Sequence, residues 1–132
     1  MPVEMTTFEL PGGTRCLRMV TIGHFSKEDA DAVVQKTDPG GDYAGLPQLI
    51  LTQQQKSISS EARAIVARRR NLGEFEPWSA IVVTNPIIRV TTNFLVRIGR
   101  NKRVRLFGNE VEAAQWLGEQ VEEEKKARKA SG

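Results

Sequence analysis

The sequence has few of the residues from which catalytic, metal and disulfide sites are built. Its 132 residues include one histidine, His24, and one cysteine, Cys16. One cysteine cannot form an internal disulfide, and the pair cannot supply the four ligands of a structural zinc site. No two acidic residues have the spacing of a metal motif or a glycosidase dyad. No motif brings an acid, a base and a nucleophile together, so we expect no metal, no cofactor and no enzymatic activity.

Long apolar runs are also missing. The longest wholly apolar segments are a few residues long, so none is expected to span a bilayer. The first nine residues lack the basic start and apolar core of a signal peptide, which together with the single cysteine favours the cytoplasm. The net charge is only +3. Nucleic-acid readout is not favoured, because neither interleaved aromatic residues nor a known binding module accompanies the basic residues.

Apolar segments that alternate with helix signals predict an α/β fold. The strands Thr7–Leu10 and Arg15–Ile22 flank a Pro-Gly-Gly turn and predict an antiparallel hairpin. The expected elements after the hairpin are a helix from the cap Ser26 to Thr37, a strand at Leu49–Thr52, a helix from Ser57 to Leu72, a strand at Trp78–Thr84, a helix from the cap Asn85 to Gly99, a strand at Arg103–Phe107 and a helix from the cap Asn109.

The order is β-β-α-β-α-β-α-β-α, which predicts a mixed, mostly parallel sheet with right-handed crossovers. We expect one domain over residues 1–121 and a charged, fraying helical tail over 122–132. The buried stripe of the last helix is expected at Val111, Ala114, Leu117 and Val121.

The stretch around the middle strand is the most informative for function. The strand Leu49–Thr52 and the polar segment Gln53–Lys56, expected as a loop, lead into a helix start that contains three serines. Ser59 or Ser60 can cap this helix by accepting a hydrogen bond from a backbone N–H. Either could instead carry a phosphate, which the helix N-terminus favours electrostatically. The residues alone leave both readings open.

The chain also resembles a known family in its order of elements and in its ending Arg105–Leu117, RLFGNEVEAAQWL. These resemble the STAS-type domains related to bacterial anti-sigma-factor antagonists, above all their SpoIIAA-like branch. That branch often has Ala-Arg after the middle strand, here Ala62-Arg63, and an arginine in the following helix, here Arg89. The resemblance covers residues 8 to about 121. It implies a sheet of four or five strands with helices packed mainly on one face.

The resemblance further implies that the middle strand, loop and helix face a partner. In the anti-sigma antagonists an Asp-Ser pair begins this helix, and a partner kinase phosphorylates the serine. The aligned pair here is Ser59-Ser60, so Ser60 is the implied phosphorylation site, with Ser59 beside it. The acid of that pair is replaced here by Ser59, and Thr52 stands where the family often has Asp.

These features predict a non-enzymatic regulatory or protein-interaction domain that acts through Ser57–Arg63. Open α/β sheets usually bind at the carboxyl ends of their strands. The candidate contacts to an unidentified protein partner are therefore Ser57, Arg63, Asn85 and Arg89.

The alternative is a small-molecule carrier. An apolar or nucleotide ligand would lie between sheet and helices near Phe94, Leu95 and Trp116. The basic residues also allow an anionic ligand, although cations at helix C-termini are stabilising without one. The sequence leaves open whether the chain forms a homodimer.

Overall fold

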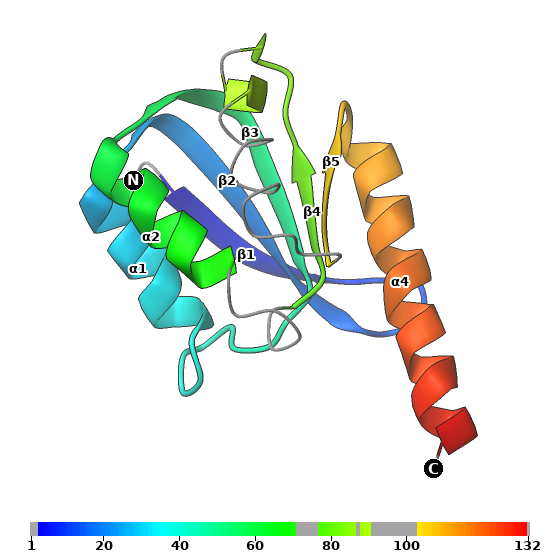
Figure 1. Cartoon of the computed structure of the whole chain (residues 1–132). Helices are drawn as coiled ribbons and strands as arrows, with labels where there is room; N and C mark the ends of the chain where they lie inside the picture. The colour runs from blue at the N-terminus through cyan, green and yellow to red at the C-terminus, as the bar shows by residue number, and fades with distance from the viewer. Residues whose placement is uncertain (1–2, 71–76, 87, 91–102, 132) are drawn as a thin grey trace.

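A single five-stranded sheet organises the chain, in the order β1-β2-β3-β4-β5 (Figure 1). The computed structural model describes residues 3–70, 77–86, 88–90 and 103–131. The elements with defined bounds are β1 (Val3–Glu9), β2 (Arg15–Phe25), α1 (Lys27–Thr37), β3 (Gln48–Ile58), α2 (Ser60–Arg70), β4 (Ser79–Val82), β5 (Val104–Phe107) and α4 (Glu110–Ser131).

Strand directions follow the predicted fold class. β1 pairs with β2 in antiparallel fashion, and the turn between them is closed by a hydrogen bond of 2.9 Å from Leu10 N to Thr14 O. The pairs β2–β3, β3–β4 and β4–β5 are all parallel. Ile50 of β3 lies opposite Ile81 of β4, which confirms that the two middle strands are parallel neighbours. The mixed, mostly parallel α/β sheet is therefore confirmed.

The two faces of the sheet carry separate cores. On one face, Met19, Ile50 and Ile81 pack with Ala30 of α1 and Ala62 of α2. On the opposite face, the strands pack against α4; the buried residues there are Leu10, Cys16, Val20, Leu49, Leu51, Ala80, Val82, Ala113, Leu117 and Val121. Figure 1 shows α1 and α2 together on one side of the sheet and α4 on the other.

The N-terminal caps of two helices agree with the sequence prediction. Ser26 caps α1 in a capping box, because its side chain accepts from Asp29 N and its own N–H donates to the Asp29 carboxylate. Asn109 caps α4, with Glu112 N donating to Asn109 Oδ1 at 2.9 Å. Local side-chain chemistry therefore fixes where both helices begin.

The predicted burial of Val111 is wrong. Its side chain is 77% exposed, and Ala113 takes the buried position instead. The stripe that faces the sheet is Ala113, Leu117 and Val121, spaced four residues apart, with Ala114 half-buried at its side. Val111 precedes this stripe by two positions, which is roughly 200° around a helix, so it points to the opposite side. α4 runs without interruption to Ser131, and the division into domain and tail at Val121 stays a prediction.

The predicted loop Gln53–Lys56 is also wrong, because β3 continues through it to Ile58. The pairing with β2 shifts twice on the way. Val20 lies opposite Leu51 but Ile22 lies opposite Gln54, and a second shift follows between Gly23 and His24. Each shift places one extra residue in β3, which is a β-bulge. The period-two alternation of a strand is lost at a bulge, so the sequence looks like a loop there.

The later start of α2 follows from this longer strand. α2 begins at Ser60, three residues after the predicted Ser57, and its predicted end at Leu72 lies outside the described residues. Pro86 is helical as predicted, and Ile88 N donates to Asn85 Oδ1 at 3.5 Å, which agrees with Asn85 as the cap. The rest of that predicted helix, to Gly99, lies outside the described residues apart from 88–90.

Candidate functional site

The carboxyl ends of β2 and β3 bring together most of the predicted site residues. We call His24, Ser57, Ser60 and Arg63 the strand-end rim; all four side chains are exposed. His24 and Ser57 lie opposite each other in the strand pairing, and His24 Nδ1 is 2.7 Å from Ser57 Oγ. The α2 helix starts directly after β3, so Ser60 and Arg63 lie on its first turn beside this pair.

The two adjacent serines have different roles in the fold. Ser59 is the N-cap of α2, because its Oγ accepts from Ala62 N at 3.0 Å. Its own N–H donates to Phe25 O at 2.9 Å, which ties the helix start to the end of β2. Ser60 is the first residue of α2 and is exposed. The capping requirement is met by Ser59, so the hydroxyl of Ser60 is available for other chemistry.

Charged side chains at the start of α1 interact with the first turn of α2, which carries part of the strand-end rim. Lys27 donates a hydrogen bond to Asp31 at 3.1 Å. This hydrogen bond, the charge of Asp31, and the weaker fields of Glu28 and Glu61 raise the pKa of the Lys27 ammonium. Glu61 belongs to the first turn of α2, so the first turns of α1 and α2 are close enough for their charges to interact.

Asn85 and Arg89 follow β4, the neighbour of β3 in the sheet. Asn85 is half-buried and Arg89 is exposed, and Arg89 N donates to Asn85 O at 2.9 Å. The two strands are parallel, so these residues follow the same end of the sheet, although β4 ends opposite Leu51, seven residues before β3 ends at Ile58. Ser57, Ser60 and Arg63 thus lie at the end of β3, and Asn85 and Arg89 follow the end of β4.

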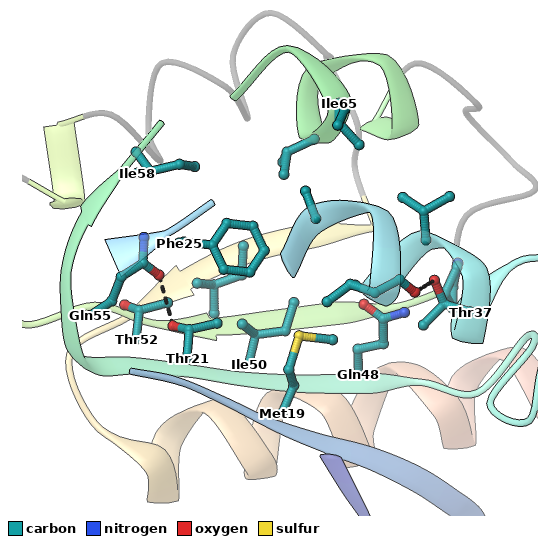
Figure 2. A pocket seen from close by; sticks show the side chains of 16 residues that line it. Met19, Thr21, Phe25, Thr37, Gln48, Ile50, Thr52, Gln55, Ile58 and Ile65 are labelled. Carbon is teal, nitrogen blue, oxygen red and sulfur yellow. Dashed lines mark hydrogen bonds between the residues drawn. The ribbon is translucent and has the colours of Figure 1, made fainter. Parts of the chain in front are cut away.

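Sequence reasoning missed a cavity of about 120 Å³ between the sheet and the helices α1 and α2 (Figure 2). Its floor on the sheet is apolar and includes Met19, Ile50 and Ile81. The helices close the other side with aliphatic side chains; those lining the cavity are Ala30, Val33, Val34, Ile65 and Val66. The cavity lies on the α1 and α2 face, beneath the helix that carries Ser60 and Arg63.

A polar group occupies one end of this cavity. Thr21 Oγ1 donates to Gln55 Oε1 at 2.7 Å, and both residues are buried. Gln55 Nε2 donates to Ser57 O at 3.4 Å, and Thr52 Oγ1 donates to Val82 O at 2.8 Å. Figure 2 shows Thr21, Thr52 and Gln55 side by side there, with Gln48 at the far end.

The bulges of β3 explain why these side chains face inward. Before the first bulge, the cavity is lined by every second residue of β3, Gln48, Ile50 and Thr52. After each bulge the spacing becomes three, so Gln55 and then Ile58 point into the cavity. The sequence signal was the polar run Gln53–Lys56, which has no simple strand periodicity.

The aromatic residue predicted for an apolar ligand site lies elsewhere. Trp116 belongs to α4, and its ring packs against Trp78 and Phe107 with centroid distances of 5.9 and 5.6 Å. This cluster belongs to the opposite face of the sheet, so Trp116 does not line the cavity. Phe94 and Leu95 lie outside the described residues.

The remaining reactive side chains that the structure describes do not gather into a second site. Cys16 is buried, and burial raises the pKa of its thiol to about 11, against a smaller lowering by Lys125. Among residues 3–70, 77–86, 88–90 and 103–131, no three His, Cys, Asp or Glu side chains gather as metal ligands would. Within that same part of the chain, no helix combines the length and apolarity that crossing a membrane requires.

Comparisons with known proteins agree on a small α/β domain. The profile of the family described as "Domain of unknown function (DUF7793)" matches residues 17–121. A solved structure of an uncharacterised DUF3478-family protein from Shewanella loihica PV-4, described as having a SpoIIAA-like fold, superposes with a TM-score of 0.63. The sequences are 14% identical, and the match covers 87% of this chain and 93% of that one. No curated protein matches the sequence. The predicted resemblance is confirmed for the fold.

Proposed function

Because the chain belongs to the DUF7793 domain family and has a SpoIIAA-like fold, we propose that it is a cytoplasmic, non-enzymatic regulatory domain that binds a protein partner through the strand-end rim. One observation carries this proposal. Ser57, Ser60 and Arg63 are exposed together where β3 ends, while the neighbouring Ser59 is used to cap the helix. A rigid sheet thus presents exposed polar groups, of which Ser57 pairs with His24 while the Ser60 hydroxyl is not needed for the helix cap.

Ser60 is the residue on which a phosphoryl switch would act. A phosphate at the first position of α2 lies at the positive end of the helix dipole. Arg63 follows three positions later, which places it on the same side of the helix, where it can pair with a phosphate. Glu61 opposes the added charge from the same turn. Phosphorylation would therefore change the charge of the rim and leave the cap at Ser59 intact.

Asn85 and Arg89 extend the proposed surface along the same edge. Arg89 adds a second exposed cation, after the end of the neighbouring strand β4. Two arginines on a partner-facing edge favour an acidic or phosphorylated counterpart, because a guanidinium can bind a carboxylate or phosphate with two hydrogen bonds.

The test compares charge reversals at matched positions. The full chain, tagged and expressed in its native host, is purified with its partners as wild type, Arg63→Glu and Lys129→Glu. Lys129 lies in the last turn of α4 and is exposed, so it gives nearly the same charge change far along the chain. We expect Arg63→Glu to lower recovery of a co-purified partner at least tenfold, with Lys129→Glu close to wild type.

Phosphopeptide mapping of the same wild-type protein addresses the switch. Phosphate on Ser60, and none on Ser59, is the expected pattern. Equal partner recovery from all three proteins would reject the rim as the binding surface, and absence of phosphate on Ser60 under all growth states would reject the switch.

A further inference from the structure

The cavity between the sheet and the helices α1 and α2 has the composition of a ligand site rather than of a packing defect. Core voids in proteins are few and apolar. This one is bordered by hydroxyl and amide side chains at one end, those of Thr21, Thr52 and Gln55, and by Gln48 at the other (Figure 2). Its lining includes two glutamines and three threonines, which an apolar packing void would not have; they are Thr21, Thr37, Gln48, Thr52 and Gln55.

The side chains at the polar end of the cavity can still form hydrogen bonds with a ligand, mostly as acceptors. The protons of the Thr21 and Thr52 hydroxyls are donated within the wall, so each oxygen still has lone pairs to accept with. Gln55 Nε2 has two N–H groups, and its single bond among the described residues goes to Ser57 O. The wall thus offers acceptors and one donor to a molecule inside the cavity.

The part of the lining that the structure describes carries no charged side chain. None of the described residues that line the cavity is acidic, basic or a histidine. An ionised ligand would lose its hydration there without gaining a counter-charge, which is strongly unfavourable. The volume of about 120 Å³ is also small, close to the roughly 150 Å³ of a cavity that binds benzene, so a single ring is about the largest group it admits. A nucleotide or a lipid with a charged headgroup does not fit these two properties.

We propose that this cavity binds an uncharged organic molecule about the size of one aromatic ring, whose hydroxyl, carbonyl or amide group bonds to Thr21, Thr52 and Gln55. The apolar part of the molecule lies over Ile50 and Ile81, under α1 and α2. The evidence for this cavity does not depend on the proposed function of the strand-end rim. The two sites are physically connected, because Gln55 donates a hydrogen bond to the backbone of Ser57.

The test uses three probes of similar shape and the full chain. Benzyl alcohol is uncharged and has a hydroxyl, toluene has no polar group, and benzoate is ionised at pH 7. Amide NMR titrations should show saturable shifts centred on β3 at Thr52, Gln55 and Ile58 with benzyl alcohol. The Kd for benzyl alcohol should be at least tenfold lower than for benzoate.

Two variants and a matched control locate the site. Val33→Phe places a ring in the cavity and should abolish the shifts, whereas Val111→Phe makes the same change at an exposed position on the opposite side of the sheet and should not. Gln55→Leu should weaken benzyl alcohol binding severalfold and leave toluene binding unchanged. If Gln55 only supported the cavity wall, the binding of both probes would change alike. Benzoate binding as tightly as benzyl alcohol, shifts centred on α4, or no saturable shift with any probe would each overturn the proposal.

Discussion

Replacing Thr21 of β2 with valine tests the polar end of the cavity at its most buried side chain. Thr21 and Gln55 are 3% and 7% exposed, and Thr21 Oγ1 donates to Gln55 Oε1 at 2.7 Å. Valine keeps the shape of threonine and removes the hydroxyl, so the Gln55 oxygen loses its described donor. Leaving a buried acceptor unsatisfied costs about 1–3 kcal/mol. With an m-value of about 2 kcal/mol/M, the urea midpoint should fall by roughly 0.5–1.5 M.

Urea unfolding followed by tryptophan fluorescence measures this loss, and a mutant cycle isolates its cause. Gln55→Leu should cost less than Thr21→Val, because the Thr21 hydroxyl also lies 3.5 Å from Leu51 O. The double variant leaves neither partner unsatisfied and should cost about 1–2 kcal/mol less than the sum of the single changes. Thr7→Val, the same change at an exposed position on β1, should stay within about 0.5 kcal/mol of wild type. Additive costs, or a Thr21→Val loss no larger than the control, would refute the reasoning.

Three further outcomes follow from single contacts. Ser59→Ala should lower the free energy of unfolding by about 1 kcal/mol, because the α2 cap is lost, whereas Ser60→Ala should lower it by less than about 0.5 kcal/mol. Urea midpoints measure both changes. A larger loss for Ser60→Ala would mean that Ser60, not Ser59, is the cap. Burial opposes ionisation of Glu124, but its Trp78 hydrogen bond and two arginines outweigh burial and lower its pKa. Ionised Glu124 therefore stabilises the folded state above the ordinary carboxyl pKa, and this stabilisation is lost as the pH falls through the lowered pKa of the folded state. Glu124→Gln removes this group, so the variant should lose less stability than wild type as the pH is lowered below about 5. Cys16, with its pKa near 11, should react with iodoacetamide at pH 8 at least tenfold more slowly in the folded than in the urea-unfolded chain.

Local signals explain why much of the fold could be predicted. The Pro-Gly-Gly turn between β1 and β2, and the caps Ser26 and Asn109, act within a few residues of themselves. The parallel pairing of β3 with β4 followed from apolar strands that alternate with helices. In each case the physical cause lies within the segment that carries the pattern.

The missed features depend on contacts between distant segments. The bulges of β3 are defined by pairing with β2, and the inward turn of Gln55 depends on Thr21, 34 positions earlier. No periodicity in the run Gln53–Lys56 encodes that pairing, so the polar residues looked like a loop. Val111 was misplaced for a similar reason: the stripe that α4 buries is set by its angle to the sheet, and several apolar stripes were compatible with its sequence.

The most direct test of the central claim, that a partner binds at the strand-end rim, is position-resolved cross-linking in the native host. A photoreactive amino acid replaces Ser60 in one protein and Glu119, exposed on α4, in another. The account predicts one discrete protein adduct from position 60, lost when Arg63→Glu is added, and no such adduct from position 119. The same adduct from both positions, or an adduct from position 119 alone, would contradict it.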